Sequence, residues 1–138
     1  MESFWEYNEH NIDGKGRLVL PSTFRANLEG GGVLTWMGRR LAIYPPAVWE
    51  ARLRKLSNDP AITPRQFSLL RSYVTAFTPD SQNRVTIPAR LREQSGLDRS
   101  VALIGMGDHI DLYDLDAWKA LEVAEATEEL YDRLTEAN

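Results

Sequence analysis

Two matching stretches decide the fold: Asp13-Gly14-Lys15-Gly16-Arg17-Leu18-Val19-Leu20-Pro21 and Asp80-Ser81-Gln82-Asn83-Arg84-Val85-Thr86-Ile87-Pro88. Asp, Arg and Pro recur at the same spacing, and apolar residues follow each arginine at the first and third positions. This alternation of period two is typical of a short strand, and the polar residues before it are typical of a turn. Because proline donates no hydrogen bond to a sheet, Pro21 and Pro88 are expected to end their strands.

The similarity continues beyond these stretches, over whole units. Val33-Leu34-Thr35-Trp36 parallels Val101-Ala102-Leu103-Ile104, and Leu41-Ala42-Ile43-Tyr44 parallels Ile110-Asp111-Leu112-Tyr113. Trp49 and Trp118 then follow at matching positions. Each unit is therefore expected to contain an extended segment, a turn, a short strand, a short helix, two further strands and a longer helix.

This repeat divides the chain into units at 1–62 and 77–124, a bridging helix at 63–76 and an acidic C-terminal helix or tail at 125–138. Pro46 is expected to open a helix, and Thr63-Pro64-Arg65-Gln66 has the form of a capping box. Ser22 and Asp114 are candidate caps of two further helices. The expected apolar stripe of the bridging helix consists of Phe67, Leu70, Tyr73 and Val74.

The composition argues against an enzyme. The 138 residues include no cysteine, which excludes thiolate nucleophiles and cysteine-based zinc sites. His10 and His109 stand alone, without the spacing of a metal site or a nucleophile–base pair. No apolar run approaches the roughly 20 residues that cross a bilayer. We expect a cytoplasmic protein with no catalytic residue, metal, cofactor, small-molecule substrate or membrane partner.

The net charge of −4 argues against nucleic-acid binding, but the charged residues are distributed unevenly along the chain. Residues 1–70 carry nine Lys/Arg against seven Asp/Glu, whereas residues 71–138 carry seven against thirteen. Most of the excess acid lies between Asp108 and Glu136. A fold that directs this acidic end away from the turns would leave a basic face free, and we expect that separation.

The two turns carry the chemistry of a DNA contact. Lys15 supplies a point charge for phosphate, and Arg17 a planar fork that matches O6 and N7 of guanine in the major groove. In the second copy, Arg84 supplies the fork and Gln82 replaces the lysine. These four residues are the candidate DNA-binding residues.

The remaining turn residues are expected to hold the turns. Asp13 and Asp80 would repel phosphate, so we assign them to accepting backbone N–H bonds or bracing the arginines. Gly14 and Gly16 supply positive φ in the first turn, and Asn83 tolerates the left-handed region in the second. The alternative is that each Asp–Arg pair is only a salt bridge that locks a tight turn. Arg25 and Arg92, at matched places on the short helices, are more typical of scaffold or subunit-contact residues.

The chain closely resembles the MraZ family from about Phe4 to Trp118. The resemblance rests on the doubled Asp-x-x-x-Arg motif, each copy followed by a proline and a short helix with arginine at its fourth position, and on the residues that precede the first motif, Tyr7, His10 and Ile12. It implies an α+β fold: a pseudo-symmetric, β-barrel-like domain of two swapped-hairpin SpoVT-AbrB-type units with flanking helices.

The same resemblance implies a function. Members of the family resemble transcription regulators that bind G-rich direct repeats in the promoter of the division and cell-wall gene cluster. For this chain the resemblance implies a nucleoid-associated repressor. Double-stranded promoter DNA and further copies of the chain, as a ring-like homo-oligomer, are the implied partners. A single protomer neutralises few phosphates, so repetition of the turns around an oligomer would raise the affinity.

Two other classes of function stay open from the sequence. The chain could be an interaction adaptor or antitoxin-like module that binds a partner protein through the helices of Trp49 and Leu130, with incidental DNA binding. A small barrel hydrolase is the second alternative, and the lack of a nucleophile–base or carboxylate–metal constellation disfavours it.

Overall fold

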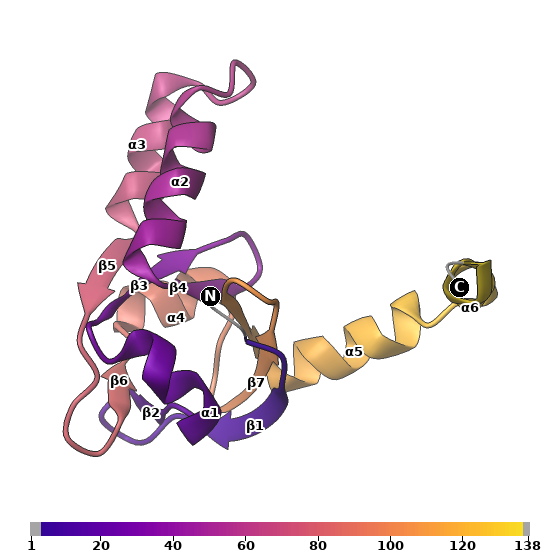
Figure 1. The fold of residues 1–138 in the computed structure, drawn as a ribbon, viewed down its shortest axis with the longest axis horizontal. Helices are drawn as coiled ribbons and strands as arrows, with labels where there is room; N and C mark the ends of the chain where they lie inside the picture. The colour runs from indigo at the N-terminus through magenta and orange to yellow at the C-terminus, as the bar shows by residue number, and fades with distance from the viewer. Residues whose placement is uncertain (1–3, 137–138) are drawn as a thin grey trace.

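The computed structural model describes residues 4–136, so residues 1–3 of the predicted first unit and 137–138 of the predicted tail lie outside the description. The fold is α+β, as predicted (Figure 1). The strands are β1 (Tyr7–Asn11), β2 (Arg17–Val19), β3 (Gly32–Trp36), β4 (Leu41–Tyr44), β5 (Val74–Phe77), β6 (Arg84–Thr86), β7 (Ser100–Gly105) and β8 (Ile110–Asp114). The helices are α1 (Ser22–Arg25), the 3₁₀ turn η1 (Ala26–Leu28), α2 (Pro46–Ser57), α3 (Pro64–Ser72), α4 (Ala89–Ser95), α5 (Leu115–Glu125) and α6 (Glu128–Glu136).

Strands from both halves of the chain form one antiparallel sheet, in the order β1-β7-β8-β4-β3-β5. Its two edge strands are exchanged between the halves: β1 pairs with β7, and β5 pairs with β3. β1 and β5 do not pair with each other, so the sheet is open and the expectation of a barrel-like closure is wrong. A separate two-stranded ribbon, β2–β6, covers the sheet instead.

The ribbon pairs the two repeated stretches, 13–21 and 80–88. β2 and β6 run antiparallel, with Leu18 opposite Val85. Both of these side chains are buried, and they belong to one apolar cluster with Leu34, Leu103 and Leu112 of the large sheet. Burial of these side chains fixes the ribbon to the core, and it leaves the other face of the ribbon toward solvent.

The helix ends follow most of their sequence signals. Pro46 opens α2, Thr63 and Gln66 form the predicted capping box, and Asp114 accepts a hydrogen bond from the backbone of Ala117. Two expectations are wrong. Ser22 does not cap α1, because it lies inside the helix and Pro21 holds the cap position. The predicted stripe also extends too far, since α3 ends at Ser72 and Val74 begins β5.

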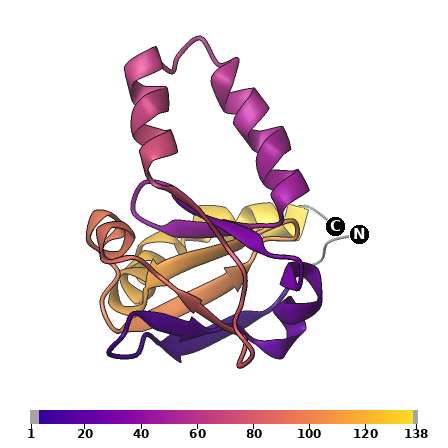
Figure 2. The same ribbon diagram turned by 90° about the vertical axis from the view of Figure 1, so that its left-hand side faces the viewer.

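Two helical extensions leave the sheet. α2 and α3 project from it as a hairpin whose helices are splayed in Figure 2, and α5 leads away from it to α6 in Figure 1. The acidic C-terminal end therefore lies far from the β2–β6 ribbon, as expected from the charge pattern. No helix among residues 4–136 is long and apolar enough to cross a membrane.

Candidate nucleic-acid interface

The first turn is held by the carboxylate of Asp13. Its Oδ1 accepts the backbone N–H groups of Lys15 and Arg17, both at 2.9 Å, and its Oδ2 accepts the side-chain Nε–H of Arg17 at 2.7 Å. These bonds hold the pKa of the Asp13 carboxyl below its ordinary value, and the backbone N–H of Arg17 is the largest cause. Asp13 therefore stays ionised and fixes both the turn and the arginine.

The second turn repeats this arrangement atom for atom. Oδ1 of Asp80 accepts the backbone N–H groups of Gln82 and Arg84 at 2.9 Å, and Oδ2 accepts Nε–H of Arg84 at 2.8 Å. The pKa of the Asp80 carboxyl is lowered for the same reason, led by the backbone N–H of Arg84. We call each of these units an Asp–Arg clamp.

The position before each arginine is left-handed. Gly16 has φ of 79° and Asn83 has φ of 59°, whereas Gly14 has no positive φ, which corrects the expectation that both glycines supply one. Asn83 does more than tolerate this conformation, because its side-chain amide donates a buried hydrogen bond of 2.8 Å to the carbonyl of Leu20. The second turn is thereby tied to the end of the opposite strand.

Both arginines lie on the outward face of the ribbon. Leu18 and Val85 point into the core, so the residues on either side of them in β2 and β6 point outward. Arg17 lies opposite Thr86, and Arg84 lies opposite Val19. The two arginines are therefore diagonal neighbours, a relation that places Cα atoms about 7–8 Å apart.

Each guanidinium keeps one edge free. The clamp uses Nε, and within residues 4–136 neither Arg17 nor Arg84 donates a further side-chain hydrogen bond. Both Nη groups of each arginine thus remain as a pair of parallel donors at a partly exposed position. Lys15 and Gln82 are exposed at the tips of their turns. The structure thus places the two arginines on one face of one ribbon, and Lys15 and Gln82 in the turns that precede its two strands.

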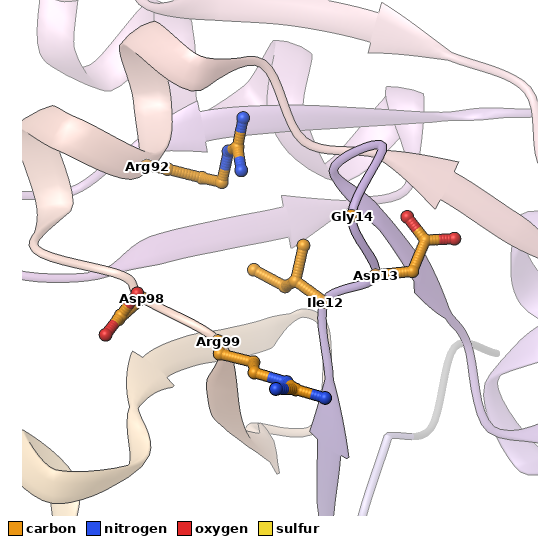
Figure 3. A pocket seen from close by; sticks show the side chains of 6 residues that line it. All are labelled: Ile12, Asp13, Gly14, Arg92, Asp98 and Arg99. Atoms are coloured by element: carbon orange, nitrogen blue, oxygen red, sulfur yellow. The ribbon is translucent and has the colours of Figure 1, made fainter.

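A hollow of about 550 Å³ beside the first turn is lined by two further arginines and by Asp98 (Figure 3). Arg92 extends from α4 and Arg99 from the segment before β7, toward the chain at Ile12 and Gly14. The Arg92 guanidinium lies directly against Gly16, where a Cβ atom would come within 3.5 Å of it. Arg92 was expected to be scaffold, and here it supports the first turn from behind.

Comparison with known proteins identifies the relatives of this chain. The family model of the MraZ protein, described as antitoxin-like, matches residues 4–72 and residues 74–137. The chain belongs to the MraZ family. Three relatives named "Transcriptional regulator MraZ" come from Kocuria rhizophila, Clavibacter michiganensis and Mycobacterium tuberculosis. They are 38%, 36% and 36% identical to the chain, and the matches cover 80%, 78% and 78% of it and the same shares of the relatives. Transcription regulation, not catalysis, is the class of function that these relatives support.

The histidines of this MraZ-family chain lie outside the ribbon face. His10 lies in β1 and pairs with Val101 of β7. His109 was taken to stand alone, but its Nδ1 lies 2.7 Å from Asp108 and its Nε2 lies 3.2 Å from Asp111. Its ring also stacks on Tyr44. The close sequence spacing of Asp108, His109 and Asp111 was the available signal for this cluster.

Arg99 is the residue of the candidate interface that sequence reasoning missed. It belongs to neither copy of the Asp–Arg motif, and its backbone carbonyl accepts the N–H of Ile12 at 2.7 Å just before the first turn. Only the pairing of β1 with β7 brings it there. A motif search within one MraZ unit contains no signal for a residue contributed by the other unit.

Proposed function

We propose that this chain is a sequence-specific regulator that binds double-stranded promoter DNA through the outward face of the β2–β6 ribbon. Arg17 and Arg84 read bases, Lys15 and Gln82 contact phosphates or neighbouring bases, and Asp13, Gly16, Asp80 and Asn83 hold the turns. The single observation that carries the proposal is the duplicated Asp–Arg clamp, which fixes each guanidinium by Nε and leaves both Nη groups free.

The shape of the ribbon fits the major groove. That groove admits a two-stranded β-ribbon, and the commonest specific contact within it is a bidentate arginine on guanine O6 and N7. A free arginine loses rotamer freedom on binding, whereas a clamped one has already been oriented. The alternative of a clamp that only locks the turn gives no reason for the free edges of Arg17 and Arg84 to share one exposed face.

The electrostatics favour the same surface. Both clamp carboxylates are neutralised by their own arginines, and around the first turn the positive charges of Lys15, Arg92 and Arg99 outnumber the one further carboxylate, Asp98. The acidic residues of α5 and α6 lie on the far side of the molecule (Figure 1). Approach of DNA to the ribbon is thus not opposed by the net charge of the whole chain.

The finer features of the proposal follow the family resemblance. We propose a cytoplasmic, nucleoid-associated repressor that binds G-rich direct repeats upstream of the division and cell-wall genes as a ring-like homo-oligomer. One ribbon supplies two base-reading arginines, and each good bidentate contact contributes only about 1–3 kcal/mol of discrimination. Repetition of ribbons along repeated sites raises the effective concentration of each further contact.

We also propose that the domain consists of two swapped-hairpin units, at 1–62 and 77–124, with 63–76 as a bridge and 125–138 as an appended tail. The exchange of edge strands supports two swapped units: β1 of the first unit pairs with β7 of the second, and β5, which spans the end of the bridge and the start of the second unit, pairs with β3 of the first. So do the reciprocal hydrogen bonds from Leu20 N to Asn83 O and from Ile87 N to Gly16 O, at 2.9 and 2.7 Å.

A gel-shift titration on the DNA upstream of the chain's own gene tests the proposal. The Arg17→Ala, Arg84→Ala double variant should retain its circular dichroism spectrum and lose specific binding. The Arg39→Ala, Lys119→Ala double variant, which also removes two exposed positive charges but outside the ribbon, is the matched control and should bind as the wild type does. Unchanged binding by the folded double variant would overturn the assignment of the ribbon, and absence of binding by the wild type would favour a protein-interaction module.

A further inference from the structure

The C-terminal arm, α5 and α6, carries apolar side chains that remain exposed within the described residues 4–136. Trp118 anchors the start of α5 against Tyr7 and Tyr113, with ring centroids 6.2 and 5.2 Å apart. Beyond this anchor, Val123 is 84% exposed and Leu134 is 62% exposed. Exposed apolar side chains gathered on one element are typical of a contact surface.

The exposed residues of α6 form a stripe. Leu130, Tyr131 and Leu134 lie at positions i, i+1 and i+4, which share one side of a helix. The acidic residues Glu128, Glu129, Asp132 and Glu136 occupy the remaining circumference. Such a helix gains little stability alone in water, because most of the stability of a short helix comes from packing of its apolar face.

An apolar groove of matching character lies on the α2–α3 hairpin. It has a volume of about 470 Å³ and is lined mainly by Trp36, Met37, Leu56, Ile62, Leu69 and Leu70. These residues come from both helices of the hairpin, from the loop between them and from the start of the β3–β4 turn.

The two surfaces carry opposite charge. The hairpin, residues 46–72, has five Lys/Arg against two Asp/Glu, whereas the arm, residues 115–136, has two Lys/Arg against seven Asp/Glu. The five basic residues, Arg52, Arg54, Lys55, Arg65 and Arg71, are exposed, and none of them forms a salt bridge with another residue in the range 4–136. Complementary charge of this kind selects one partner surface and its orientation.

We infer that α6 of one copy of this chain docks in the α2–α3 groove of a second copy. The second copy is the occupant because α6 and the hairpin of the same chain point in different directions from the sheet (Figure 1). Leu130, Tyr131 and Leu134 enter the groove, and the flanking carboxylates face the arginines of its rim. Because donor and acceptor surfaces differ, each copy uses both, and the contact continues from copy to copy until a ring closes.

This inference rests on the homo-oligomer named in the proposed function and assigns its interface. It gives the acidic arm a role in assembly. It also places the contact on elements separate from the β2–β6 ribbon, so assembly leaves the ribbon of every copy free.

Cysteine cross-linking of the full-length chain tests the inference, since the natural sequence has no cysteine. Leu69→Cys marks the groove and Leu134→Cys marks α6, and both sites are substantially exposed, so the substitutions should leave the fold intact. A mixture of the two single variants under oxidation should give a disulfide-linked dimer, and the double variant should give a ladder of covalent oligomers. The matched control mixes Leu69→Cys with Glu128→Cys, on the acidic side of α6, in place of Leu134→Cys. This pair should cross-link at least tenfold more slowly than the pair with Leu134→Cys.

Three results would overturn the inference: no cross-link in the mixture, a disulfide confined within single chains of the double variant, or equal cross-linking by Glu128→Cys.

A second measurement needs no cysteine. Leu134→Glu should reduce the mass found by light scattering toward that of one chain, while Glu93→Gln, which neutralises an exposed carboxylate of α4 outside both surfaces, should leave it unchanged; an unchanged mass for Leu134→Glu would also contradict the docking. Cross-linking by a chain that does not bind DNA would refute the proposed function alone, and DNA binding without the cross-link would refute the interface alone.

Discussion

Arg17 and Arg84 come from opposite halves of the chain and lie diagonally across the β2–β6 ribbon on its outward face. Each is clamped by an aspartate four residues earlier, at 2.7 Å for Arg17 and 2.8 Å for Arg84. The sequence repeat thus becomes a spatial pair of arginines with the same fixed orientation relative to their strands. Two such forks on one ribbon can address neighbouring bases in a single groove.

The two turns should differ in their dependence on salt. Lys15 contributes a charge at the tip of the first turn, whereas Gln82 at the matching place is neutral. Loss of one phosphate contact lowers the slope of log K against log salt by about 1. Lys15→Ala should therefore reduce the slope of DNA binding for each bound protomer, and Gln82→Ala should not. Equal slopes for both variants would show that Lys15 does not contact a phosphate.

Local features of the candidate site could be predicted from the sequence. The turn ahead of each strand, the proline that ends it and the aspartate that orients each arginine all depend on residues within nine positions of one another. Local hydrogen-bonding preference and period-two burial determine such features. The prediction that Asn83 adopts a left-handed conformation is confirmed for the same reason.

The long-range features could not be predicted. The pairing of β2 with β6, the exchange of β1 and β5 and the open sheet all depend on contacts between distant segments. Periodicity assigns a residue to the inner or outer face of a strand but does not identify its neighbouring strand. For that reason the position of Arg99 beside the first turn and the hydrogen bond from Asn83 to Leu20 emerge only from the structure.

Asn83 should be more sensitive to alanine than to glycine. Both substitutions remove the buried hydrogen bond to the Leu20 carbonyl, which costs about 1–3 kcal/mol. Alanine in addition must adopt φ near 59°, at a further cost of about 1 kcal/mol, whereas glycine adopts it readily. Urea unfolding should thus rank the wild type above Asn83→Gly, and Asn83→Gly above Asn83→Ala. Equal stability of the two variants would show that the backbone conformation imposes no cost.

Gly105 should not accept a side chain. A Cβ atom there would lie 2.4 Å from the backbone carbon of Phe4, and the backbone N–H of Gly105 also donates to Glu6 at 2.8 Å. Backbone on both sides leaves no flexible group to move, so Gly105→Ala should lower the free energy of unfolding by at least about 2 kcal/mol. Gly30→Ala is the matched control, because its Cβ would meet no atom within 4 Å, and its effect should stay within about 0.5 kcal/mol. Thermal unfolding of both variants gives the comparison.

His109 should make stability depend on pH near neutrality. Burial lowers the pKa of His109, but hydrogen bonds to Asp111 and Asp108 outweigh it and raise the pKa above the ordinary 6.5. A raised pKa in the folded state stabilises the protein fully below the pKa of the unfolded state, and this stabilisation is lost as pH rises through the folded pKa. The free energy of unfolding should therefore fall with rising pH from about 6.5 upward.

Two variants separate this effect from other titrations. His109→Gln should flatten the pH dependence above 6.5. Asp108→Asn should lower the pKa of His109 in an NMR titration of the ring protons, because it removes a negative charge 2.7 Å from Nδ1. An unshifted titration in Asp108→Asn would exclude that ion pair as a cause.

The conservative Arg17→Lys, Arg84→Lys double variant tests base reading by the ribbon most directly. Lysine retains the charge and loses the planar fork, so binding to phosphates should persist while discrimination between bases falls. Fluorescence anisotropy measures the affinity for the upstream promoter DNA and the affinity for a shuffled duplex of the same composition, and the ratio of the two affinities reports the discrimination between bases. We predict that the ratio of the two affinities falls by about 5-fold to 150-fold for each bidentate contact that is lost, with little change in affinity for the shuffled duplex. An unchanged ratio in the folded variant would contradict the account.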